Sequence, residues 1–271
     1  MIIAHYFTHW IFFGWVIATI FAADQLREDQ VHFRQGKALF EAHDDTGEAL
    51  EEAQREFTRA LQLNPRLAEA VAYLGFIAAE RNQYETALES YRRALQLDSH
   101  SPEAHVGLAR ISQHNGNHKE ALDYLRKAVA GGPKNPLALR ELAAALSNEM
   151  AQPTVPMWQE AIGCWLTLIG LDRDDRDAHY DLGGAYRRFG KWHEAELEFR
   201  EVLRIGQTSE DSDVWVYSVH REVAEMLEKQ VKYPEAIQEY RALINSEGAG
   251  DYEIGNAKAR IAVLERSLKS R

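Results

Sequence analysis

A pattern of small and bulky residues recurs along this chain at a nearly constant spacing, and it limits the available folds more than any other feature. An alanine is followed four residues later by a bulky, usually aromatic residue at Ala53/Phe57, Ala87/Tyr91, Ala121/Leu125, Ala161/Trp165, Ala195/Phe199 and Ala236/Tyr240. The steps between successive alanines are 34, 34, 40, 34 and 41 residues. Twelve or more residues before the last five of these alanines, a small residue follows an aliphatic one, at Leu74/Gly75, Leu108/Ala109, Leu142/Ala143, Leu182/Gly183 and Val223/Ala224. Self-similarity of this kind indicates stacked copies of one supersecondary unit.

The repeated unit is predicted to be a pair of helices, because the Val/Ile/Thr alternations typical of strands are absent from residue 27 onward. The stretches "LGFIAAERNQYETALESYRRAL" and "LGGAYRRFGKWHEAELEFREVL" resemble the tetratricopeptide repeat, a helix–turn–helix unit of 34 residues. The resemblance covers about residues 29–246 and implies an all-α, right-handed α-solenoid of about six repeats. We place these repeats at about 29–66, 68–101, 102–135, 136–175, 176–212 and 217–248, within an array over residues 24–250.

The small residues predict where the two helices of a repeat cross. Two helices approach closely only where the facing side chains are small, so Gly75 is expected to face Ala87, and Gly183 to face Ala195. Asn82, Gly116 and Gly190 tolerate a left-handed backbone and are expected to end the first helices.

Three longer connections and a final helix depart from the simple repeat. "HDDTGEAL", "SNEMAQPTVPMW" and "GQTSEDSDVW" are predicted to be loops. Residues 251–271 carry a single apolar stripe with steps of three and four residues, formed by Ile254, Ala257, Ile261, Leu264 and Leu268. This pattern predicts a helix that caps the open end of the stack, and a docking helix for a partner is the alternative.

The first 23 residues, "MIIAHYFTHWIFFGWVIATIFAA", are mostly apolar and contain no Asp, Glu, Lys or Arg. As one helix they can span a bilayer of about 30 Å, so they are either a retained transmembrane anchor or a cleaved export signal. We favour the anchor, because no basic residue precedes the apolar run and Ile20 and Phe21 suit a cleavage site poorly.

The sequence gives conflicting indications of the side of the membrane on which the repeat array lies. Arg27, Arg34 and Lys37 follow the apolar segment, which favours a cytoplasmic array by the positive-inside rule. Asp24, among other acids, dilutes this flank, and short N-terminal apolar segments commonly lead export. We therefore expect an extracytoplasmic array, periplasmic if the source is bacterial, with a cytoplasmic-facing or secreted array as the alternatives.

Composition excludes several classes of function. The formal net charge is −11, and an acidic body repels phosphate backbones, so nucleic acid is not expected as a partner. Cys164 is the single cysteine, which rules out an intrachain disulfide and a cysteine-based zinc site.

The candidates for chemistry all have simpler explanations. The acidic stretch "LDRDDRDAHYD" lacks the Gly and Glu of a calcium loop and is expected to cap the following helix. His114 and His118 have no evident carboxylate or thiol partner, and Cys164 is expected to be a buried thiol. With no nucleophile, base and orienting group together, we predict no catalytic activity, no metal and no cofactor.

The resemblance also implies a binding surface, because the first helices of such repeats line a concave groove that holds a polypeptide. Carried over residue by residue, the predicted groove residues are Phe33, Phe40, Phe76, Arg110, Arg140, Tyr180, Arg187, Arg188 and Arg221, with a wider lining that includes Ser147, Gly184, Glu225, Glu228 and Lys229. The arginines predict a partner segment with acidic and apolar residues, or else they pair with acids of this chain.

Three functional hypotheses follow. The first is a membrane-tethered interaction scaffold that helps to assemble or recruit a membrane or envelope complex. The second is a non-catalytic subunit of a redox or pigment-bearing membrane complex, with His5 or His9 near the cofactor, because these histidines share one helix face. The third is a secreted adaptor, released by signal cleavage.

Overall fold

The computed structural model describes residues 28–42, 47–148, 154–206, 213–246 and 248–270, and all regular structure in these ranges is helical. The predicted anchor (residues 1–23), His5 and His9 lie outside the described residues. In the ranges that are described, no helix is both long enough and apolar enough to cross a bilayer.

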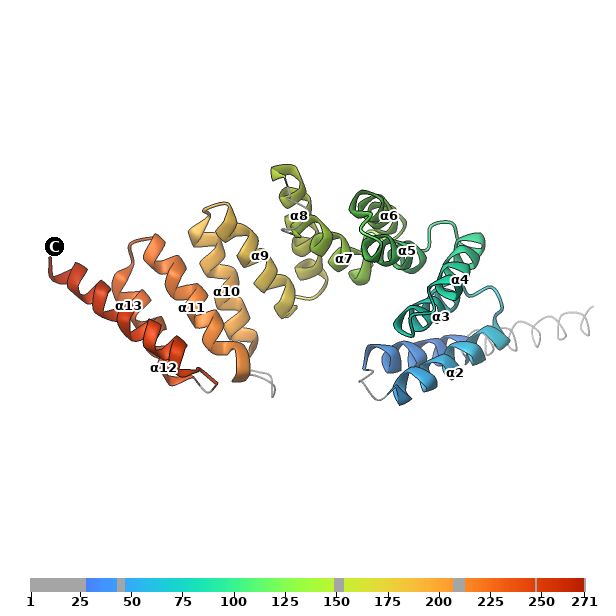
Figure 1. Cartoon of the computed structure of the whole chain (residues 1–271), viewed down its shortest axis with the longest axis horizontal. Coiled ribbons are helices and arrows are strands. Elements are labelled where there is room, and N and C mark those ends of the chain that lie inside the picture. The colour runs from blue at the N-terminus through green and yellow to red at the C-terminus, as the bar shows by residue number, and fades with distance from the viewer. Residues whose placement is uncertain (1–27, 43–46, 149–153, 207–212, 247, 271) are drawn as a thin grey trace, which may run out of the picture. The chain divides into compact units, whose positions relative to one another are not determined.

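The chain divides into two compact units, Met1–Glu141 and Leu142–Arg271, and the boundary falls inside one helix. The first unit contains a helix over residues 28–41 and then α2 (Glu48–Leu63), α3 (Ala68–Glu80), α4 (Tyr84–Leu97), α5 (Pro102–His114), α6 (His118–Gly131) and the start of α7 (Pro136–Ser147). The second contains the rest of α7 and then α8 (Val155–Leu171), α9 (Arg176–Arg188), α10 (Trp192–Gly206), α11 (Asp213–Lys229), α12 (Tyr233–Asn245) and α13 (Asp251–Lys269) (Figure 1).

Short turns join the paired helices, and their geometry follows from a few residues. Asn82 (φ 59°), Gly116 (φ 76°) and Gly190 (φ 68°) adopt the left-handed backbone expected of them. Val231 (φ 62°) does so as well, which the sequence did not suggest, since a β-branched residue rarely occupies this region. At the start of α5, the Ser101 hydroxyl accepts a hydrogen bond from the backbone N–H of Ala104.

Glycines in the first helices make room for aromatic rings of the second helices. A Cβ atom added to Gly75 would lie 2.6 Å from the Tyr91 ring, and one added to Gly183 would lie 2.9 Å from the Phe199 ring. The three atoms nearest to such a Cβ on Gly75 all belong to the Tyr91 ring, four residues beyond Ala87, and the facing of Gly75 and Ala87 themselves stays a prediction. A ring needs the space of a missing side chain more than a methyl group does, and Ala87 is itself fully buried.

Aromatic residues form the core of the first unit. Tyr73 lies at its centre, with ring centroids 5.1 Å from Phe57, 5.4 Å from Phe76 and 5.7 Å from Phe33. Phe40 packs on both Tyr73 and Phe76, at 5.6 and 6.0 Å. These contacts join the helix over residues 28–41 to α2 and α3.

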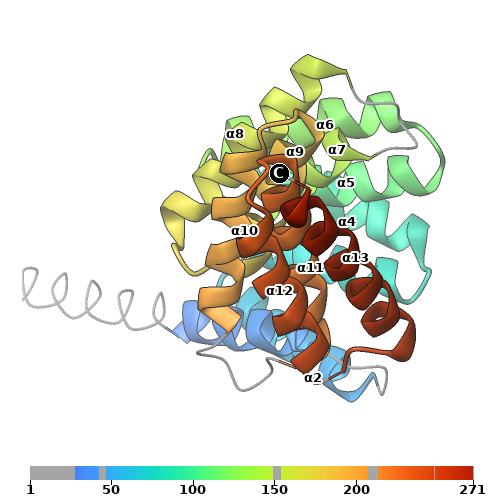
Figure 2. The same cartoon turned by 90° about the vertical axis from the view of Figure 1, so that its left-hand side faces the viewer.

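In the second unit, α11, α12 and α13 lie side by side (Figures 1 and 2). α11 begins at Asp213, four residues before the expected start of the sixth repeat. Its first three residues, 213–215, belong to the stretch that we had assigned to a loop. α13 packs on α12 through Ala257 and Leu264, which are buried. Leu268, which was expected in the same apolar stripe, is 39% exposed.

Candidate polypeptide-binding groove

Three of the groove residues predicted in the first unit are aromatic, and all three pack in the cluster of rings around Tyr73. Phe76 is only 2% exposed, so the prediction that it lines an open groove is wrong. It is covered by Phe40 and by Arg110, whose guanidinium carbon lies 5.2 Å from the centre of the Phe76 ring. Phe33 and Phe40 are half-buried.

Arg110 forms an ion pair within the chain. Its Nε and Nη2 atoms donate to one oxygen of Glu141, at 3.0 and 2.5 Å. This is the alternative considered for the groove arginines, in which they neutralise the protein's own acids. Arg140, beside Glu141 on α7, is exposed.

In the second unit, three predicted groove residues line one open hollow, which we call the α9 hollow. Its volume is 420 Å³, and it is lined by Ser147, Trp158, Trp165, Tyr180, Asp181, Gly184, Ala185, Arg187 and Arg188. The buried rings of Trp158 and Trp165 come from α8, and Arg188 lies over the Trp158 ring at 4.9 Å. Gly184 leaves space here, since no atom lies within 4 Å of a Cβ placed on it.

Charged groups at the α9 hollow are already partly satisfied. Arg187 Nη1 donates to Glu222 Oε2 at 2.5 Å, and the Glu222 side chain is 7% exposed. Arg221 lies 3.7 Å from the other oxygen of Glu222. Tyr180 packs edge-on against Phe199, and burial, together with the charge of Glu222, raises the pKa of its hydroxyl.

The remaining predicted groove residue, Arg221, lines a larger hollow of 880 Å³ between α11, α12 and α13, which we call the α13 hollow. Its wall on α11 consists of Arg221, Glu225, Glu228 and Lys229, and these four were all part of the predicted lining. The wall on α13 includes Tyr252, Asn256, Arg260 and Val263. Residues 251–271 were expected to cap the stack, with a docking helix for a partner as the alternative, and the hollow that they line together with α11 and α12 was not predicted.

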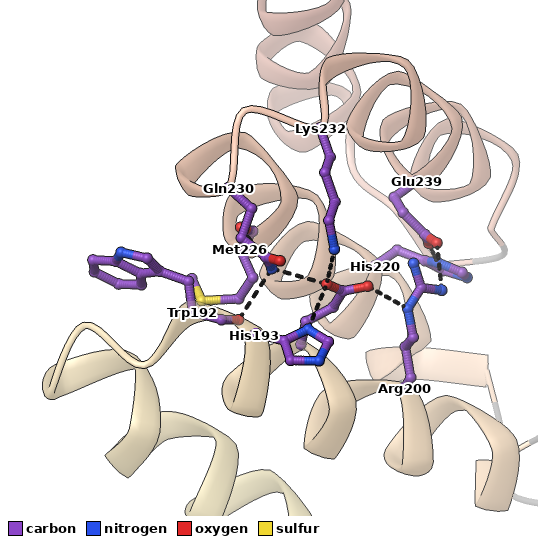
Figure 3. Close-up of polar contacts among 9 residues, drawn as sticks. Trp192, His193, Arg200, His220, Met226, Gln230, Lys232 and Glu239 are labelled. Atoms are coloured by element: carbon purple, nitrogen blue, oxygen red, sulfur yellow. Dashed lines mark hydrogen bonds and ion pairs between the residues drawn. The ribbon is translucent and has the colours of Figure 1, made fainter.

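A buried carboxylate network ties the last repeats of the second unit together (Figure 3). Glu196 accepts hydrogen bonds from Arg200 (2.9 Å), Gln230 (2.8 Å) and Lys232 (3.3 Å). Burial alone would raise the pKa of Glu196, but these three donors lower it below its ordinary value. None of these residues lines the α9 or α13 hollow, so we assign the network to stability rather than to binding.

A histidine recurs at one position of the repeat, and sequence reasoning overlooked it. His32, His105, His179 and His220 each lie four residues before the small residue of a first helix. In three repeats the histidine bonds a glutamate of the second helix: His32 to Glu56 at 2.6 Å, His179 to Glu198 at 2.6 Å and His220 to Glu239 at 2.8 Å. The matching glutamates all lie three residues after the repeat alanine, so aligning the repeats on one another could have revealed these pairs.

The candidates for chemistry have structural roles. Asp175 caps α9 by accepting from the backbone N–H of Ala178 at 3.1 Å, as expected for this acidic turn. His114 stacks on Tyr84, with ring centroids 4.9 Å apart. Cys164 is buried, and burial raises the pKa of its thiol to about 11, which disfavours the reactive thiolate. Among the described residues, no group of three or more His, Cys, Asp or Glu could hold a metal ion.

Helical hairpins stacked through small residues, with open hollows along their first helices, define a helical-repeat protein of the kind that binds other polypeptides. The model of the tetratricopeptide repeat matches residues 37–102, 77–136 and 158–210, and the chain belongs to this family. Proteins with this fold are generally non-catalytic interaction scaffolds.

Solved structures agree on the fold. The crystal structure of YrrB, described as a TPR protein with an unusual peptide-binding site, is 20% identical, with a TM-score of 0.56 over 74% of this chain and 97% of YrrB. PilW, described as a widely conserved type IV pilus biogenesis factor, is 14% identical, with a TM-score of 0.55 over 84% of this chain and 97% of PilW. PilF of Pseudomonas aeruginosa is 24% identical, with a TM-score of 0.52 over 75% of this chain and 90% of PilF. No curated protein sequence matches the chain.

Proposed function

We propose that this protein is a membrane-tethered scaffold that binds a segment of a partner protein along the first helices of its second unit. The observation that carries the proposal is the α9 hollow. The buried side chains of Trp158 and Trp165 line it, together with the exposed Tyr180, Arg187 and Arg188. Aromatic rings beside arginines are typical of sites where a polypeptide is anchored.

We propose a partner segment that is less acidic at the α9 hollow than the sequence predicted. Arg187 already donates a hydrogen bond to Glu222, and Arg110 in the first unit donates one to Glu141. These contacts leave less support for acidic residues in the partner, and the buried rings of Trp158 and Trp165 favour the apolar part of the prediction.

Site-specific photocrosslinking tests the proposal directly. A photoreactive phenylalanine analogue replaces Tyr180, which lines the α9 hollow and is 38% exposed. The matched control places the same analogue at Leu197, which is 49% exposed on α10 and lines neither hollow. We expect a defined crosslinked protein from position 180 in native membranes and none from position 197. Equal products from both positions, or products from 197 alone, would contradict the proposal.

The tether is the second part of the proposal. It rests on the apolar, uncharged residues 2–23, and we further propose that the repeats face the extracytoplasmic side and aid assembly or recruitment of a membrane or envelope complex. Extraction of native membranes with carbonate, followed by mass spectrometry of the N-terminus, tests this part. A chain that starts at Met1 or Ile2 and stays in the membrane pellet is expected, whereas a soluble chain that starts near Ala23 would identify the secreted adaptor instead.

A further inference from the structure

The α13 hollow offers apolar surface that the fold leaves uncovered. Tyr252 on α13 is 77% exposed and Val263, three turns along the same helix, is 39% exposed. Both line the hollow, together with Tyr233 and Leu243 of α12. An apolar side chain or the methylene stem of a long side chain could bury against these groups.

Cationic groups in the α13 hollow each have a partner within the chain. Arg260 donates through both Nε and Nη2 to the carboxylate of Glu228, and the Nε distance is 2.9 Å. The Lys229 ammonium lies 5.7 Å from the centre of the Trp192 ring. Arg221 lies 3.7 Å from Glu222. An acidic ligand would therefore have to compete with existing contacts.

The carboxylates of the α13 hollow differ from one another. Glu228 is neutralised by Arg260 and also accepts from the Tyr240 hydroxyl at 2.8 Å. Glu225, almost one turn earlier on α11, has no hydrogen bond or ion pair within the described part of the chain, although it lines the same hollow. Burial and the charge of Glu222 raise the pKa of Glu225, and the charges of Arg221 and Arg187 only partly oppose this effect.

We infer that the α13 hollow receives a lysine or arginine side chain of the partner segment, with its cation at Glu225 and a neighbouring apolar residue against Tyr252 and Val263. Charge complementarity carries the inference, because Glu225 forms no hydrogen bond or ion pair among the described residues, whereas the cations that line the hollow each have a partner. A hydrogen bond between a cation and this half-buried carboxylate would be stronger than a neutral one. The inference rests on the proposed function, and it names the partner's chemistry at one end of the binding surface.

Selection from a random dodecapeptide library displayed on phage tests the inference, with the full chain in detergent micelles as the target. Synthetic versions of the selected peptides are then titrated by fluorescence anisotropy. We expect them to carry Lys or Arg beside a large apolar residue. Their Kd should weaken about tenfold or more with Glu225→Gln, the effect of losing a charged hydrogen-bond partner.

Two further variants make the test specific. Glu235→Gln removes the same charge from an exposed position of α12 outside the hollow and should change Kd less than twofold. Tyr252→Ser should weaken binding several-fold, and it cannot act through the fold because the ring is 77% exposed. The melting temperature of Glu225→Gln should stay at or above that of the wild type, since a neutral isostere removes a partly desolvated charge.

The alternatives give different results. Selected peptides rich in Asp and Glu, or equal losses with Glu225→Gln and Glu235→Gln, would overturn the inference and leave the proposed function standing. Failure to select any peptide, together with no crosslink from position 180, would overturn both.

Discussion

The two units share one repeat pattern but connect their repeats with different chemistry. In the first unit a cluster of aromatic rings, with Tyr73 at the centre, joins the helix over residues 28–41 to α2 and α3. In the second unit, buried carboxylates link α10 to the later helices, as in the hydrogen bonds of Gln230 and Lys232 to Glu196 (Figure 3). Packed rings stabilise the fold mainly by removing apolar surface from water, whereas the stability that ion pairs provide depends on pH and salt. The same arrangement of hairpins can therefore respond differently to solution conditions in its two parts.

The largest expected effect tests the aromatic side of this comparison. Tyr91 is 1% exposed and its ring fills the space above Gly75. Tyr91→Ala should lower the free energy of unfolding of the first unit by about 3–5 kcal/mol, as for other buried aromatic residues. Urea denaturation followed by hydrogen exchange would locate the loss. Tyr252→Ala serves as the control and should leave stability within about 0.5 kcal/mol of wild type, because that ring is exposed.

The next prediction asks whether the glycine–ring contact is common to both units. Gly183→Leu in α9 should destabilise the second unit by about 1–3 kcal/mol, because its side chain would collide with the Phe199 ring. Gly184→Leu, one residue later, meets open space at its Cβ and should be neutral or stabilising. Thermal melting of the two variants checks the contrast. Equal melting temperatures would show that the ring can move aside and that the contact does not set the helix crossing.

Glu196→Ala tests the ionic side. The variant leaves Arg200, Gln230 and Lys232 without their shared acceptor, and we expect a loss of about 1–2 kcal/mol, limited by the partial exposure of the two cations. Glu235→Ala, at an exposed position of α12, is the matched control. If both variants have the wild-type melting temperature, the Glu196 network contributes nothing measurable to the stability of the second unit. The proposed difference between the two units would then be wrong for the ion pairs.

The smallest effect concerns pH and uses two histidines at the same repeat position. His179 bonds two acceptors, Glu198 through Nδ1 and the Arg173 carbonyl through Nε2, so only the protonated ring can donate to both. The hydrogen bond that the ring donates to Glu198 is the main cause that raises the pKa of His179. In the first unit, burial lowers the pKa of His105.

The two shifts predict opposite slopes of stability against pH. His179 stabilises the second unit below its unfolded pKa of about 6.5, and this contribution is lost as pH rises through the higher folded pKa. The contribution of His105 is present above about pH 6.5 and is lost as pH falls through that value towards the lower folded pKa. Melting curves from pH 5 to 8 should show each slope flattened by His179→Gln or His105→Gln respectively. A His179→Gln variant with the wild-type pH profile would contradict the assignment of a charged ring.

The sequence predicts the repeat frame well, because the pattern reports local requirements. Asn82, Gly116 and Gly190 mark the ends of first helices, since few residues tolerate the backbone needed there. Val231 adopts the same left-handed backbone after α11 without any such signal in the sequence. The start of α11 was placed too late because several acidic residues before it could each begin a helix.

Binding residues were harder to predict, because repeat position fixes the face of a helix but not what covers it. Phe76 occupies a groove position, but Phe40 and Arg110 cover it. Arg110 and Arg187 were expected to face a partner, and each pairs with a glutamate more than 30 positions away in the sequence. Such pairs arise only when repeats stack, so a single repeat read alone does not reveal them. For the same reason, the sequence did not predict the hydrogen bonds of Glu196 or the hollow that α13 lines together with α11 and α12.

Tyr91 has a further consequence, because its ring lies against two glycines from successive hairpins. One is Gly75 of its own repeat and the other is Gly107 of the next, which approaches the ring even more closely. A single side chain therefore belongs to two neighbouring hairpins at once, and neither can detach without uncovering it. Fraying that starts at α5 and α6 should therefore expose the Tyr91 ring and lower the stability of the hairpin of α3 and α4 that remains.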